Sequence, residues 1–172
     1  TIGILAGGGR LPLLVAESVI AHGGGVHIVA LEGDADRQVA RFPHTWANIG
    51  AFGRMLGALR GAGAEELVIA GGIRRPDLRR VRPDLGLVRL LPMLTGILAG
   101  GDNAVLTQVV RLFEREGLRV RGAHEVAPDL LAPAGRMGTV PLPSAAKADA
   151  TLAFDLMAAL APLDAGQAAV VA

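Results

Sequence analysis

The stretch that decides the fold is IGILAGGGRLP, residues 2–12. Its first five residues form an apolar run with the length and composition of a buried β-strand. Three glycines follow at once, and an apolar pattern of helical length begins at Leu11. A strand, a glycine turn and a helix in this order direct backbone N–H groups and a helix N-terminus at a phosphate. The stretch therefore predicts an α/β sheet and a nucleotide or another phosphorylated ligand.

The composition agrees with a sheet that helices cover on both faces. Of 172 residues, 51% are hydrophobic but only 3% are aromatic, so the core must consist of Leu, Val, Ile and Ala. The absence of cysteine excludes a disulfide framework and a thiolate metal site. A net charge of +1 does not support bulk nucleic-acid binding. The apolar runs all stop short of the roughly 20 residues that a membrane span needs.

Alternating patterns predict a Rossmann-like, mostly parallel sheet with helices on both faces and right-handed crossovers. The expected strands are residues 1–6, 26–31, 67–70, 118–121 and a final one at 170–171. The expected helices are residues 11–22, 52–61, 87–99, 104–116 and 149–160. The stretch between 34 and 52 is mixed and polar, and no element is expected in it.

The chain is expected to contain one domain and the beginning of another. Residues 1–127 form the Rossmann-like domain, residues 128–145 a proline-rich linker, and residues 146–172 the start of a second, truncated α/β domain. The chain begins at Thr1 without Met and stops inside an apolar run, so a C-terminal portion is expected to be missing.

The first candidate site is the loop of Gly7, Gly8 and Gly9 with Arg10. Glycines leave no Cβ to obstruct a phosphate. The loop is an incomplete dinucleotide fingerprint, because Pro12 stands where the third glycine belongs, although Glu32 lies about where a ribose-binding acid is expected. The alternative is a tight turn without a ligand.

The second candidate also follows a strand and combines glycine with charge. It consists of Gly71, Gly72, Arg74, Arg75 and Asp77. Guanidinium groups can neutralise phosphate oxygens through paired hydrogen bonds. The alternative is a solvated arginine-rich loop, or ion pairs with the sheet edge.

Three more residues are candidates with strong structural alternatives. Asp102 is either a helix N-cap or a carboxylate that holds Mg²⁺ through water. His124 and Glu125 follow a strand, where neighbours point to opposite faces, so both can line one site only if the backbone turns. The glycine pairs and triplets at 7–9, 71–72 and 100–101 are expected to converge at the carboxyl ends of the strands.

Four motifs together resemble a known family. IGILAGGGRLPLLVAE, AGGIRRPD, GGDNAVLTQVVRLFEREGLRVRGAHEV and LDAGQAAVV occur in this order over essentially the whole chain. They are similar to the N-terminal part of the bacterial UDP-2,3-diacylglucosamine pyrophosphatases of lipid A biosynthesis. This family is unrelated to the calcineurin-like phosphoesterases that catalyse the same step.

The resemblance implies hydrolysis of the diphosphate of UDP-2,3-diacylglucosamine to UMP and lipid X, which is 2,3-diacylglucosamine 1-phosphate. It implies Mg²⁺ or another divalent metal, whose ligands are unknown, and a substrate held by the candidate residues above. The family's catalytic acid lies in a C-terminal domain. No catalytic residue is therefore assigned here, and this chain alone is expected to be inactive.

The resemblance also implies a cytoplasmic protein that meets the inner-membrane surface peripherally, without nucleic acid, and a homodimer remains open. The sequence also fits two alternative functions. The glycine turn and Glu32 suit a dinucleotide-binding oxidoreductase domain. A non-catalytic assembly module would instead use its apolar surface to dock another protomer or domain.

Overall fold

The computed structural model describes residues 1–74, 82–88, 102–163 and 168–171, with 102–105, 145 and 163 described by their backbone alone. Two compact units are present, Thr1–Leu131 and Ala132–Ala172. Each is described by itself below. Among the described residues, no helix is both long and apolar enough to cross a membrane.

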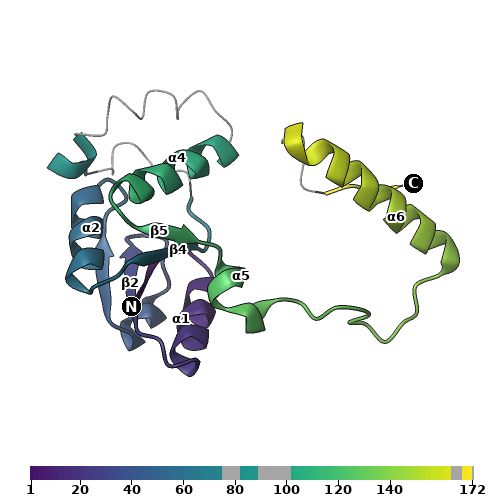
Figure 1. Ribbon diagram of the computed structural model, residues 1–172, viewed down its shortest axis with the longest axis horizontal. Helices are drawn as coiled ribbons and strands as arrows, with labels where there is room; N and C mark the ends of the chain where they lie inside the picture. The colour runs from purple at the N-terminus through teal and green to yellow at the C-terminus, as the bar shows by residue number, and fades with distance from the viewer. Residues whose placement is uncertain (75–81, 89–101, 164–167, 172) are drawn as a thin grey trace. The chain divides into compact units, whose positions relative to one another are not determined.

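The first unit is built on a five-stranded parallel sheet (Figure 1). The strands are β1 (Ile2–Ala6), β2 (Val26–Leu31), β3 (His44–Ala47), β4 (Glu66–Ala70) and β5 (Arg119–Arg121). Their order is β3-β2-β1-β4-β5, and every pair is parallel. The predicted Rossmann-like α/β fold is confirmed.

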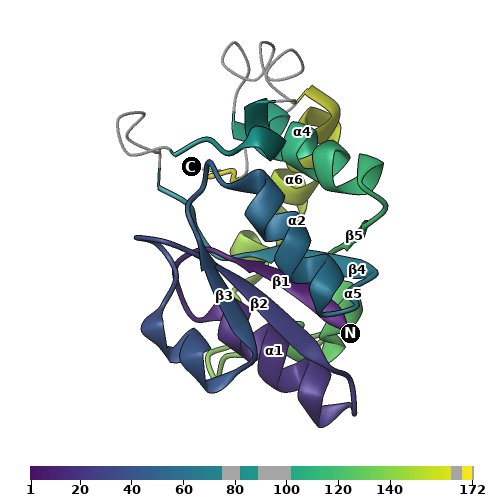
Figure 2. The same ribbon diagram turned by 90° about the vertical axis from the view of Figure 1, so that its left-hand side faces the viewer.

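Helices cover both faces of this sheet (Figure 2). They are α1 (Leu11–Ala21), α2 (Phe52–Gly61), α4 (Asp102–Arg115) and the single turn α5 (Ala123–Val126), with 3₁₀ turns η1 (Arg37–Arg41) and η3 (Pro128–Leu130). On one face, α1 packs on Ile4 and Ala6 of β1. On the other face, α2 and α4 pack around Leu5. This follows from the alternation of side chains along a strand.

The sequence missed β3, which pairs with β2 from Ile28↔His44 to Leu31↔Ala47. Its four residues, HTWA, are too few to show an alternating pattern, and only the neighbouring strand completes them. Helix α4 begins at Asp102, two residues before the predicted start. The predicted helix at 87–99 lies largely outside the described residues.

The second unit contains α6 (Ser144–Leu160) and the 3₁₀ turn η4 (Ala161–Leu163). Helix α6 starts five residues before the predicted residue 149, because the alanine-rich turn after Pro143 already favours a helix. The predicted strand at 170–171 was wrong: neither residue lies in a strand. An apolar run forms a strand only where a neighbouring strand takes up its backbone hydrogen bonds, and β5 is the last strand of the described sheet.

Candidate functional site

Two glycine loops meet where the central strands β1 and β4 end. The Gly7 N–H donates to the Ala70 carbonyl at 2.9 Å. Gly8 and Gly72 exchange two hydrogen bonds, 2.7 Å from the Gly8 N–H and 3.0 Å from the Gly72 N–H. The predicted convergence of the loops at 7–9 and 71–72 is therefore confirmed, whereas residues 100–101 lie outside the described residues.

This meeting point is the topological switch point of the sheet. The chain leaves β1 toward β2 on one side and later returns to pair β4 with the other side of β1. In open α/β sheets, ligands bind in the crevice at such a point, outside the carboxyl ends of the strands. The two loops are thus placed where this fold class binds its ligands.

Two of the loop glycines are confined by neighbouring backbone, and two others border open space. A Cβ on Gly7 would lie 2.5 Å from the Gly72 carbonyl oxygen, and one on Gly71 would lie 2.5 Å from the Gly8 oxygen. These two glycines are required because two backbones approach closely. Among the described residues, nothing lies within 4 Å of a Cβ placed on Gly9 or Gly72. The loops therefore keep open space beside Gly9 and Gly72.

Helix α1 begins beside this open space. Arg10 occupies its N-cap position and makes no side-chain cap, Pro12 lies in the first turn, and that turn holds no acidic residue. Pro12 has no N–H and the Leu13 N–H donates to the Arg10 carbonyl at 3.1 Å, but the N-terminus of the helix carries partial positive charge. The start of α1, together with the exposed Arg10, thus suits an anionic group.

A third loop joins the other two, and sequence reasoning missed it. Arg74 Nε donates to Asp34 Oδ1 at 2.9 Å, and Arg74 Nη2 donates to the Gly33 carbonyl. Gly33 and Asp34 follow β2, so the carboxyl ends of three neighbouring strands contribute. The Asp34 side chain is only 15% exposed, whereas that of Arg74 is 80% exposed. Asp34 therefore positions Arg74 while most of the arginine stays open to solvent.

Residues 82–88 are hydrogen-bonded to the loop between β3 and α2 and to the first turn of α2. Asn48 Oδ1 accepts from the Arg82 N–H at 2.9 Å, and the Asp84 N–H donates to the Gly50 carbonyl at 3.2 Å. The Asp84 carboxylate accepts from the Arg54 N–H at 3.0 Å and from the Leu87 N–H at 2.9 Å. It thus caps the first turn of α2, which has no side-chain cap of its own.

The charge state of Asp84 follows from these contacts. Burial raises its pKa, but backbone N–H donors outweigh that effect, and its pKa lies below the usual range. The structural importance of Asp84 could not be inferred from the sequence, where it is one acid within a run of arginines.

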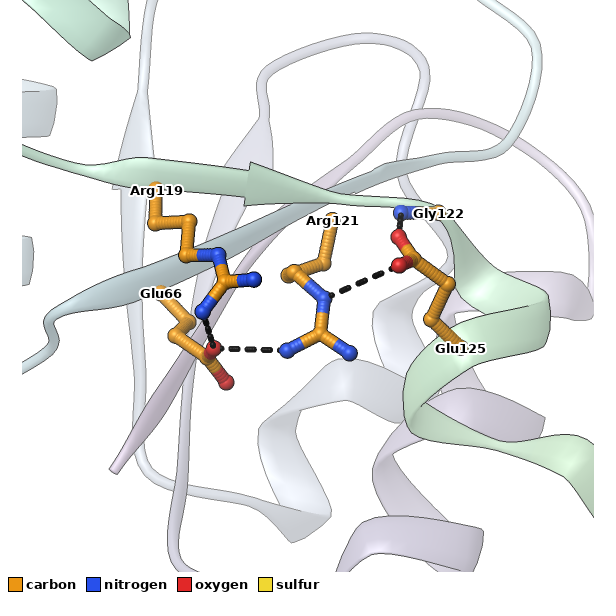
Figure 3. A network of polar contacts seen from close by, with 5 residues as sticks. All are labelled: Glu66, Arg119, Arg121, Gly122 and Glu125. Carbon is orange, nitrogen blue, oxygen red and sulfur yellow. Dashed lines mark hydrogen bonds and ion pairs between the residues drawn. The ribbon is translucent and has the colours of Figure 1, made fainter.

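His124 and Glu125 lie in α5, directly after the end of β5. The backbone does turn there, into α5, and Glu125 closes a capping box by accepting from the Gly122 N–H at 2.7 Å. Figure 3 shows Glu125 Oε1 facing Arg121 Nε at 3.3 Å, while Arg121 Nη1 donates to Glu66 Oε1 at 2.8 Å. The described partners of Glu125 thus hold α5 against β5.

The charges in this network stabilise one another. The Gly122 N–H, more than the nearby Arg121, keeps the pKa of Glu125 below its usual range. The hydrogen bond to Glu66, opposed by burial, raises the pKa of Arg121 above its ordinary value. A carboxylate so engaged is suited to holding structure rather than to exchanging a proton.

The remaining predicted site residues are not placed by the structure. Arg75 and Asp77 lie outside the described residues. Asp102 is the first residue of α4, but its side chain lies outside the described part, so both its capping role and its metal role stay predictions.

Comparison with known proteins gives the family. A family model described as LpxI N-terminal domain matches residues 1–130. The chain belongs to this family. Over 170 residues it is also 37% identical to the UDP-2,3-diacylglucosamine pyrophosphatase LpxI of Caulobacter vibrioides. The aligned region covers 99% of this chain but only 61% of that relative. The family resemblance seen in the sequence motifs is therefore confirmed.

Among the side chains that the structure describes, which do not include that of Asp102, no three His, Asp or Glu residues are placed to share a metal ion. Asp34, the acid beside the glycine loops, is already paired with Arg74. No chemical step is therefore assigned to a metal here, and the divalent metal stays a prediction.

Proposed function

We propose that this chain is the ligand-binding N-terminal part of an enzyme that hydrolyses UDP-2,3-diacylglucosamine. One water adds across the P–O–P link of the diphosphate, and the products are UMP and 2,3-diacylglucosamine 1-phosphate. The observation that carries this proposal is the identity with the Caulobacter vibrioides pyrophosphatase over nearly the whole chain.

The geometry supports placing the diphosphate beside Gly9 and Gly72. The open space there lies next to the uncapped start of α1, and Arg74 stands exposed on the neighbouring loop. Backbone N–H groups, a helix N-terminus and a guanidinium together neutralise phosphate charge without a proton transfer. In this proposal the chain's own residues bind and orient the diphosphate.

Calorimetry with UDP-2,3-diacylglucosamine and with 2,3-diacylglucosamine 1-phosphate tests the proposal, with NAD as the control ligand. We expect saturable binding of at least one lipid and none of NAD. Binding of NAD alone would replace the proposal with the dinucleotide-binding oxidoreductase function. Self-association without affinity for any of the three would favour the assembly module.

A matched pair of glycine variants locates the site. In Gly72→Ala the new methyl enters open space beside the loops, and in Gly57→Ala it enters open space on the surface of α2. A hydrogen bond to a charged group is worth about 1.5–3 kcal/mol, so displacing the diphosphate at Gly72 weakens binding at least about tenfold. Equal affinities of the two variants would place the diphosphate elsewhere.

Magnesium dependence, a cytoplasmic location and contact with the inner-membrane surface belong to the same proposal. A substrate with two acyl chains resides in a membrane, which supports peripheral contact with the bilayer. Titrating the lipid with Mg²⁺ and then with EDTA tests the metal: we expect tighter binding with Mg²⁺, because the ion would screen the diphosphate. Unchanged affinity would remove magnesium from the binding step.

A further inference from the structure

The first unit contains an open hollow between α4 and the sheet. Its volume is about 260 Å³, and it is lined by Ile69 of β4, Leu106 and Val110 of α4, and Val120, Arg121 and Gly122 at the end of β5. Four of these six residues are aliphatic. The hollow therefore suits an uncharged, apolar group.

The hollow exists because α4 is longer than β5, the strand that comes after it in the chain. Helix α4 has 14 residues and spans roughly 21 Å, while β5 has three and spans roughly 10 Å. The β4–β5 pairing ends at Val68↔Arg121, so Ile69 has no partner on β5. The first turns of α4 therefore extend beyond the end of β5, and the side chain of Leu106 on these turns is 49% exposed.

The position of the hollow connects it to the glycine loops. Ile69 lies two residues before Gly71, near the carboxyl end of β4. Helix α4 precedes β5 and runs opposite to the strands, so its first turns lie at the same edge of the sheet (Figure 1). The hollow thus lies toward the same edge of the sheet as the glycine loops.

The Arg121 guanidinium lies on the face of the sheet opposite α4, because Arg121 follows Val120, whose side chain packs with the α2 and α4 cluster. Arg121 is engaged by Glu66 at 2.8 Å and faces Glu125 at 3.3 Å (Figure 3). Its charge is thus balanced by two carboxylates of the same network. An uncharged chain matches this hollow better than an anionic head group does.

We infer that this hollow holds an acyl chain of the diacylglucosamine substrate. The inference rests on the proposed function, because the acylated ligand comes from the activity of the relative. The aliphatic lining of the hollow matches a segment of one such chain.

A chain-length series tests the site without the diphosphate. The probes are hexyl, heptyl and octyl β-glucoside, each kept below its micelle-forming concentration. Burying a methylene is worth about 0.8 kcal/mol, so we expect the dissociation constant to fall about fourfold with each added carbon. Methyl NMR signals of Ile69, Leu106, Val110 and Val120 should shift on binding. Affinity independent of chain length, or shifts confined to α6, would overturn the inference.

Two variants alter the hollow and one serves as a control. Leu106→Ala removes part of its wall, and Val110→Phe fills it. Ile20→Ala changes an aliphatic residue of similar exposure, 45%, on α1 outside the hollow. We expect octyl glucoside to bind several-fold more weakly to both hollow variants and normally to the control. Equal binding to all three variants would contradict the inference.

Two further ligands separate this inference from the proposed function. UDP-2,3-diacylglucosamine should lose affinity in Leu106→Ala, whereas UDP-glucosamine, which has no acyl chains, should not. If the lipid substrate binds the original chain and Leu106→Ala equally, the inference fails and the function stands. If the lipid substrate does not bind even the original chain while octyl glucoside does, the proposed function fails.

Discussion

Replacing Gly7 by alanine should open the junction between the two glycine loops. The new Cβ would lie 2.5 Å from the Gly72 carbonyl oxygen and 3.0 Å from both the Gly71 oxygen and the Gly72 carbonyl carbon. All three atoms belong to the backbone, so no side-chain rotation relieves the contact. The loops must separate, and the paired hydrogen bonds between Gly8 and Gly72 are lost.

The cost follows from those bonds. Two backbone hydrogen bonds at about 1 kcal/mol each give a loss of about 2 kcal/mol in the free energy of unfolding. For a unit of this size, that loss lowers Tm by roughly 5–10 °C. Gly72→Ala is the matched control, because it alters the same bridge but places its methyl in open space. We expect its stability to stay within about 0.5 kcal/mol of the original.

Urea unfolding of both variants measures the difference, and hydrogen exchange identifies its origin. The amides of Gly8 and Gly72 should exchange faster in Gly7→Ala, whereas amides in the middle of β2 should change less. Equal stability of Gly7→Ala and Gly72→Ala would refute the reasoning, since the two variants differ chiefly in this backbone contact.

Three further predictions concern side chains that hold the first unit together. Asp84→Ala should cost about 2 kcal/mol in urea unfolding, because the carboxylate caps both α2 and the turn that begins at Leu85, at about 1 kcal/mol per cap. The pKa of Asp84 is lower in the folded chain, so its stabilisation is present above its ordinary value of 3.8 and is lost as the pH falls below it. The stability gap between the original chain and Asp84→Asn should therefore narrow in acid, and a gap that widens there would contradict this sign. Ser18→Ala removes the hydrogen bond from the buried Ser18 hydroxyl to Asp129, so amides of η3 should exchange faster while those of β1 do not change.

The glycine loops show what a local sequence pattern can predict and what it cannot. A buried run followed by glycines predicts a strand and a turn, because the backbone preferences of neighbouring residues are local properties. The same pattern cannot say which glycines touch another backbone. Gly7 and Gly71 are confined by each other's loops and Gly9 and Gly72 are open, and only the pairing of β1 with β4 creates that difference.

The polar residues show the same division. Arg74 and Glu125 were both recognised as candidates from their positions after strands. The structure pairs Arg74 with Asp34 beside the glycine loops, but places Glu125 in a structural network with Arg121. Asp34 lies far from Arg74 in the chain, so no local pattern predicts that pair, whereas Glu125 is held by Arg121 and Gly122, four and three residues before it.

By itself, the sequence of this chain determined the parallel α/β sheet, the order of most of its elements and the family. Apolar periodicity and glycine turns depend only on residues that are neighbours in the chain. Only the tertiary structure decided where the loops after β1, β2 and β4 meet and how far α4 overhangs β5. Both depend on strand order and register, which arise when segments distant in the chain bury their apolar faces together.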